Sequence, residues 1–100
     1  MKLEELLEAV KDENLSLVLI EKYRDEMIHL HSAMQIEMAD LEKAEALFFL
    51  ANADPEASDI SIKRKWRGSE KGQRQIEVNR YLKALAKEID SLKSRVYRLI

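Results

Sequence analysis

Residues 63–74 combine side chains that bind a phosphate backbone with one that can stack on a base. Six of these twelve positions are lysine or arginine, and Trp66 is the single tryptophan of the chain. Lysine and arginine neutralise phosphates, and an aromatic ring can stack on an unpaired base. Gly68 and Gly72 would let the backbone bend or approach a phosphate. We therefore predict contact with a single-stranded nucleic acid by these residues: Lys63, Arg64, Lys65, Trp66, Arg67, Lys71 and Arg74.

A second interpretation of this basic segment is structural. Its cations could form a solvated face that lies against acidic residues elsewhere, with Trp66 packed in the core. The charge distribution allows this, because residues 1–59 hold 5 Lys/Arg and 15 Asp/Glu, a formal charge of −10. Residues 60–100 hold 12 Lys/Arg and 4 Asp/Glu, a formal charge of +8. Such a split indicates either a charged partner or two halves that neutralise each other.

Patterns for catalysis and metal binding do not occur in the sequence. There is no phosphate-binding loop, no nucleophile elbow and no cysteine. His29 and His31 are two residues apart, so on a helix they point to different faces and cannot chelate one metal together. We expect a protein that is not an enzyme and that uses no metal or cofactor.

Two long helices are expected to position the basic segment. The chain has only 2 glycines and 1 proline, which means few turns. Apolar residues recur at steps of three and four from Ile20 to Phe48 and from Val78 to Leu99, which is typical of coiled-coil seams. Residues 3–10 form a shorter amphipathic pattern. The predicted core and oligomerisation positions are Met27, Leu30, Met34, Met38, Leu41, Phe48, Leu82, Leu85, Ile89, Leu92, Val96 and Leu99.

The connection between the two long helices is expected at residues 53–59. Asp54 can cap a helix that begins at Pro55, and Ser58 or Asp59 can cap one that begins slightly later. One continuous second helix should follow, weakened in its first part by its two glycines.

The predicted fold is a single all-α domain over residues 1–100. An acidic helical half (1–52) and a basic helical half (60–100) fold back as an antiparallel helical hairpin, with the first long helix starting near Leu15 and a short helix before it. Two helices bury a small core, so we expect a homo-oligomer held by coiled-coil-like packing.

The predicted location is the cytoplasm. The acidic, amphipathic N-terminal segment is unlike a signal peptide, and no apolar run approaches the roughly 20 residues that span a bilayer. The absence of cysteine fits a reducing compartment. We expect no membrane partner.

Three segments resemble phage recombination mediator proteins of the UvsY type. Residues 31–42 resemble their central helix, where a His-Ser pair precedes Glu-Met and an aliphatic-Glu pair. Residues 89–97 look like their terminal helix, with a Lys-Ser-Arg-x-aromatic segment, and residues 3–6 are similar to their start. In that family a Lys-x-Arg motif with two aromatics follows the central helix directly. Residues 49–54 here contain no basic residue, so the basic segment would have to take over strand binding.

The resemblance implies a ring-like oligomer that holds single-stranded DNA and helps a recombinase replace a single-strand-binding protein. We therefore expect a non-enzymatic recombination mediator or accessory protein. The alternative is a helical structural or interaction protein that binds no nucleic acid: an adaptor, an assembly factor or an inhibitor of a host or defence protein.

Overall fold

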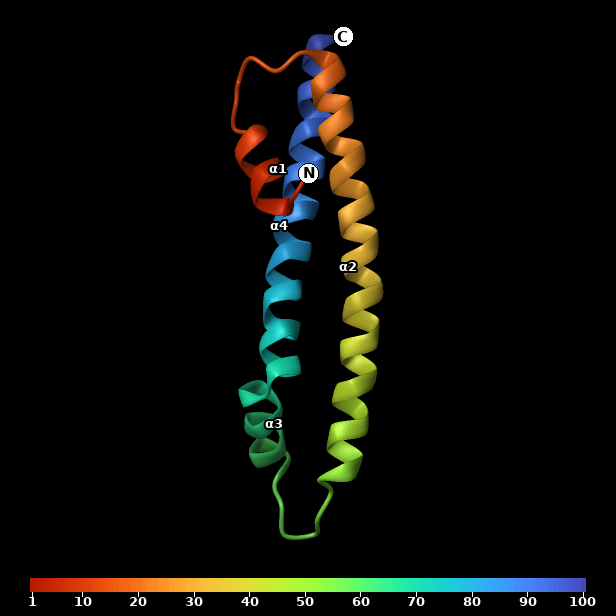
Figure 1. The fold of residues 1–100 in the computed structure, drawn as a ribbon, viewed down its shortest axis with the longest axis vertical. Coiled ribbons are helices and arrows are strands. Elements are labelled where there is room, and N and C mark those ends of the chain that lie inside the picture. Colours follow the sequence, from red (N-terminus) through yellow and green to blue (C-terminus); the bar gives the residue numbers. More distant parts are fainter.

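The computed structural model describes residues 1–100 as four helices joined by loops. The helices are α1 (Leu3–Ala9), α2 (Leu17–Ala51), α3 (Asp59–Gly68) and α4 (Glu70–Leu99). The two long helices, α2 and α4, lie side by side and antiparallel, with α3 near the connecting turn and α1 near the opposite end (Figure 1). The rod measures 61 × 21 × 18 Å. The predicted all-α hairpin with a short N-terminal helix is confirmed.

Three serines determine where α2, α3 and α4 begin. Ser16, Ser58 and Ser69 have extended backbones, and each side-chain oxygen accepts a hydrogen bond from the backbone N–H three residues ahead, at 3.0–3.3 Å. This contact satisfies an otherwise unpaired donor of the first turn. Consequently α2 begins at Leu17, two residues later than predicted, and Ser58 rather than Asp54 caps the helix after the turn.

Asp54 has a different role, inside the loop between α2 and α3. Its carboxylate accepts a hydrogen bond from the backbone N–H of Glu56 at 2.9 Å. A carboxylate that accepts a hydrogen bond from the backbone N–H two residues ahead stabilises a turn rather than a helix start. Pro55 therefore lies in the turn of the hairpin and begins no helix.

The basic half consists of two helices, so the prediction of one continuous second helix is wrong. The chain leaves the helical conformation at Ser69, where ψ is 160°, and a new helix begins at Glu70. At this elbow an added Cβ on Gly72 would lie 1.8 Å from the carbonyl oxygen of Trp66. The Ser69 hydroxyl donates to the same carbonyl at 2.5 Å. Gly72 is thus needed for close approach rather than for an unusual backbone angle.

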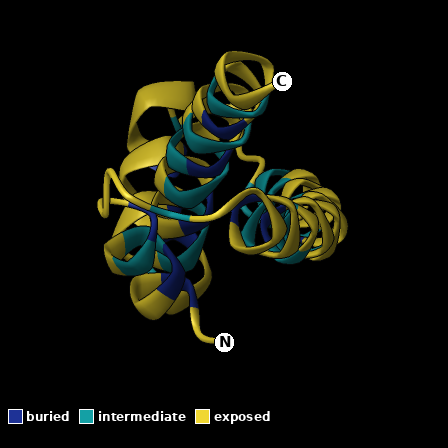
Figure 2. Cartoon of the chain, turned by 90° about the horizontal axis from the view of Figure 1, so that it is seen from above, coloured by how far each residue is buried: buried dark blue, intermediate teal, exposed yellow.

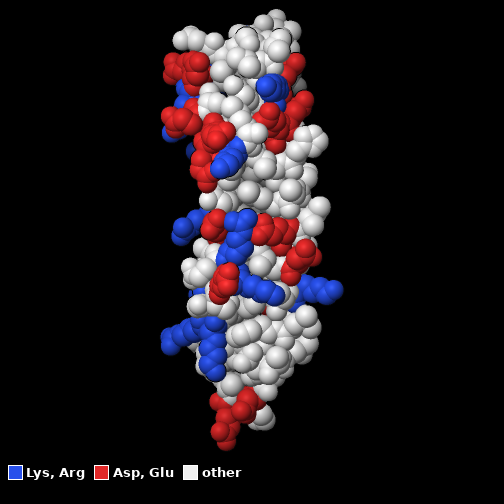
Figure 3. All heavy atoms as spheres, viewed as in Figure 1, with Lys and Arg blue, Asp and Glu red and all other residues white.

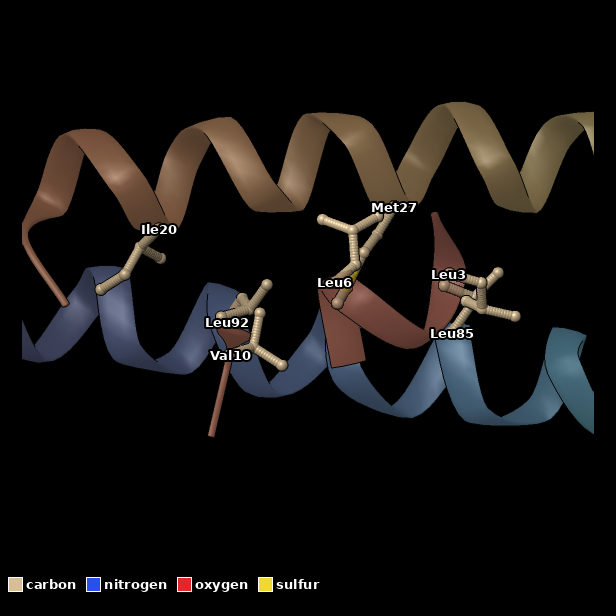
Figure 4. Packing of buried hydrophobic residues seen from close by; sticks show 7 residues of the cluster. All are labelled: Leu3, Leu6, Val10, Ile20, Met27, Leu85 and Leu92. Carbon is tan, nitrogen blue, oxygen red and sulfur yellow. The ribbon is translucent and has the colours of Figure 1, made fainter. Parts of the chain in front are cut away.

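The main hydrophobic core lies where α1 packs against the two long helices. Apolar residues from α1 point between α2 and α4 (Figure 4), and the outer faces of the helices remain exposed (Figure 2). The seven buried residues of this cluster are Leu3, Leu6, Val10, Ile20, Met27, Leu85 and Leu92. Apolar burial is the main favourable term in folding, and this cluster holds seven of the eleven buried hydrophobic residues.

The predicted seams point inward over most of their length. Met27, Leu41, Leu85 and Leu92 are buried. The half-buried positions are Leu30, Met34, Met38, Phe48, Leu82, Ile89 and Val96. Leu99 is a correction, because its side chain is 56% exposed. It is the last helical residue of α4 and lies beside the loop before α2, where it lines a shallow hollow with Leu15.

Arg95 of α4 forms hydrogen bonds with the backbone just after α1. Its guanidinium donates to the carbonyl oxygen of Val10 at 2.8 Å and to that of Asp12 at 2.6 Å. Carbonyls just after a helix lack intrahelical partners, and a cation there also interacts favourably with the helix dipole. The Arg95 side chain is therefore engaged structurally.

None of the four helices combines the length and the hydropathy needed to cross a membrane.

Candidate nucleic-acid interface

Five cations of the basic segment form an exposed group on α3 and the first turn of α4. These residues, hereafter the exposed cation group, are Lys63, Arg64, Lys65, Arg67 and Lys71. None of them takes part in any of the four ion pairs of the molecule. Figure 3 shows basic side chains gathered over the α3 end of the rod, just beyond an acidic tip at the turn. Their charge is therefore open to an external anion.

The helical period of α3 explains this exposure. Ile62 and Trp66 are four residues apart, so they share one face, and both are buried. Lys63, Arg64 and Arg67 fall on the remaining faces and are exposed. The apolar face of α3 thus packs against the rest of the rod, and the cations of α3 remain in solvent.

Trp66 differs from its predicted role as a base-stacking ring. Its side chain is only 3% exposed. Its indole N–H donates to the Gln75 side-chain oxygen at 2.6 Å, and its ring lies 5.5 Å from that of Phe48, tilted by 55°. Stacking on a base requires an open ring face, so Trp66 acts here as a core residue. The spacing to Ile62, on one face of a helix, is the sequence signal for this burial.

Arg74 is also engaged inside the molecule. Its guanidinium binds both carboxylate oxygens of Glu37 on α2, at 2.6 and 2.8 Å, and Glu77 on α4 at 2.7 Å. The hydrogen bonds from Arg74 lower the pKa of Glu37, and the same contact raises the pKa of Arg74. Two carboxylates already compensate this cation, so Arg74 is a poorer phosphate ligand than predicted.

The acidic and basic halves are joined by a single ion pair, Glu37–Arg74. The other three pairs join Glu8 to Lys11, Arg74 to Glu77, and the amino group of Met1 to Glu26. Ion pairs between the two halves therefore neutralise only one charge of each half. They involve no member of the exposed cation group.

A recess of about 330 Å³ lies beside the exposed cation group, between α2, α3 and α4. Lys63 and Arg67 line it from α3, and Glu42 and Glu45 line it from α2. Although the charges are opposite, no ion pair joins them. Lys63, Trp66 and Arg67 were singled out from the sequence as DNA contacts, but the recess itself was not predicted, because only the elbow at Ser69 brings α3 and α4 together around it.

The histidines and carboxylates do not assemble into a metal site. No group of three or more His, Asp or Glu side chains is placed to hold an ion. The α3 end presents exposed lysine and arginine side chains, with a small mixed recess next to them.

Comparisons with protein-family models, with curated proteins and with solved structures find nothing that matches this chain.

Proposed function

We propose that this protein is a non-enzymatic, single-stranded-DNA-binding protein that works as a recombination mediator or accessory factor. The exposed cation group on α3 and the start of α4 contacts the phosphates. The partners are single-stranded DNA, a recombinase and a single-strand-binding protein. Its place of action is the cytoplasm, which is the host cytoplasm if the gene belongs to a phage.

The observation that supports the proposal is the unpaired charge at the turn end of the rod. Five cations lie within nine residues, all exposed and none in an ion pair. Like charges placed together repel one another, which costs stability unless a polyanion compensates them. A nucleic-acid backbone supplies such compensation at regular spacing.

Homo-oligomerisation is part of the proposal and has separate support. Only 12 of 100 residues are buried in one chain, while Ile36, Leu47 and Leu50 on α2 are 58–74% exposed. Their spacing of 11 and 3 residues places them on one face of α2, and a contiguous exposed apolar patch is typical of a surface that another chain covers. Several chains in one assembly would also place several cation groups along one strand.

A binding measurement with a charge-reversed variant tests the phosphate contacts. Arg64→Glu/Arg67→Glu should weaken binding of a labelled single-stranded oligonucleotide at least about tenfold at low salt. The control is Lys93→Glu/Arg98→Glu, which changes the net charge equally at two exposed positions of α4 near the other end of the rod. Equal losses in both variants would mean a non-specific effect of net charge, and no binding by the unaltered protein would refute the proposal.

The alternative is an interaction protein that binds another protein and no nucleic acid. The same exposed residues, Ile36, Leu47 and Leu50, favour it, since a partner helix could cover them. In that case Leu47→Lys would abolish partner binding, and charge reversal on α3 would have no effect.

A further inference from the structure

The recess beside Trp66 has the size and position of a subsite for one nucleotide base. Its volume is about 330 Å³. Pockets for small ligands begin at about 300 Å³, so this recess is large enough for one planar ring system. It opens next to α3, the helix that carries most of the exposed cation group.

The lining offers partners for the two kinds of surface on a base, its apolar ring faces and its polar edge. Met38, Ile76 and Leu82 contribute apolar surface for the ring faces. Asn79 on α4 contributes an amide that both donates and accepts hydrogen bonds, as the edge of a base does. Glu42 and Glu45 contribute acceptors, and neither carboxylate is in an ion pair. The lining thus combines four hydrophobic residues with seven others, most of them polar or charged.

The cations at the same recess are placed for the phosphates of that nucleotide. Lys63 and Arg67 line the recess from α3 and are exposed. On α4, Asn79 lies in the lining, and Lys83 lies four residues further along the same helix face, exposed and unpaired. A strand bound at α3 can therefore continue along the outer face of α4.

We infer that this recess receives one unpaired base of the strand whose phosphates the exposed cation group holds. The inference rests on the proposed function and adds a source of strand selectivity. With the Trp66 ring buried, phosphate contacts alone would not distinguish a single strand from a duplex. A base in a duplex must first leave its stack and its partner, whereas an unpaired base enters directly.

The first experiment compares two strands of equal charge. One is a single-stranded 15-mer of thymidine, and the other is a 15-mer with the same backbone and no bases. The abasic strand should bind about tenfold more weakly to the unaltered protein. Trp66, the only tryptophan, borders the recess, so its fluorescence should change when the thymidine strand binds and stay unchanged with the abasic strand.

The second experiment fills the recess. Asn79→Phe should lower the affinity for the thymidine strand to that for the abasic strand and leave the abasic affinity unchanged. Ser91→Phe is the matched control, because Ser91 is also exposed on α4 and does not line the recess. Circular dichroism of both variants establishes that the helices are intact.

The outcomes separate the inference from the proposed function. If neither strand binds at low salt, the proposed function fails and the inference with it. If both strands bind equally well, or if Asn79→Phe and Ser91→Phe behave alike, the phosphate contacts stand and the base subsite is overturned.

Discussion

Two of the seven predicted DNA contacts, Trp66 and Arg74, contribute to the fold, and the other five, all cations, face solvent. The sequence showed a cluster of the correct residue types, but type and spacing do not state which side of a helix faces the rod. For Trp66 the spacing to Ile62 indicated an inward face. For Arg74 no local signal existed, because its partner Glu37 lies 37 residues away in the sequence.

The Glu37–Arg74 contact should make stability depend on pH in the acid range. The folded state lowers the pKa of Glu37 below 4.5, so the contact stabilises fully above pH 4.5 and loses its effect as the pH falls through the lowered value. Both side chains are more than a third exposed, so solvent screening limits the gain to about 1 kcal/mol or less.

Glu37→Gln tests this contact by urea unfolding at several pH values. The variant should be less stable than the parent by about 0.5–1 kcal/mol at pH 7. The difference should shrink as the pH falls below 4.5, because the parent loses the same contact by protonation. A difference that is constant from pH 7 to pH 3 would contradict the account.

Arg95 should contribute to stability through the two carbonyl oxygens that it binds. Arg95→Met leaves the carbonyls of Val10 and Asp12 without these donors and should cost about 2 kcal/mol of unfolding free energy. Arg98→Met is the control, since Arg98 is exposed and engages no carbonyl. Equal unfolding midpoints in urea for the two variants would refute the role of Arg95.

At the scale of elements, helix periodicity predicted both long helices and the hairpin, and it failed at the elbow between α3 and α4. Ser69 was not recognised as a cap because residues on both sides have helical character. The glycines were expected to weaken a helix, but Gly72 allows close approach to Trp66, which depends on the three-dimensional path of the chain. The cap at Ser58 was among the alternatives that the sequence left open.

The two glycines form a matched pair for testing the elbow. Gly72→Ala places a methyl group against the Trp66 carbonyl and should cost about 2 kcal/mol or more, with α3 displaced. The fluorescence of Trp66 should shift to longer wavelength as the ring becomes exposed. Gly68→Ala meets no atom within 4 Å and should be neutral or stabilising by about 0.5 kcal/mol. Similar stability and fluorescence in both variants would contradict this account of the elbow.

At the scale of the whole molecule, the charge split is only slightly compensated within one chain. One ion pair joins the acidic and basic halves, and no member of the exposed cation group is in a close ion pair. The opposite charges of the two halves were read correctly from the sequence. The number of pairs between them depends on the register of α2 against α4, which periodicity does not determine.

Salt should therefore not weaken the folded state. We expect the thermal midpoint Tm to stay constant or to rise by a few degrees between 20 mM and 300 mM salt, since screening relieves repulsion among the cations. A steady fall of Tm with salt would mean that attraction between the halves dominates, as the structural interpretation of the basic segment requires.

The central claim is that the exposed cation group binds phosphates, and the salt dependence of strand affinity tests it most directly. The logarithm of the association constant for a single-stranded oligonucleotide should fall linearly with the logarithm of salt concentration. If three to five phosphates are neutralised, the slope lies between about −2 and −3.5. Arg64→Glu/Arg67→Glu should make that slope less steep. A slope near zero, or one that this variant leaves unchanged, would contradict the claim.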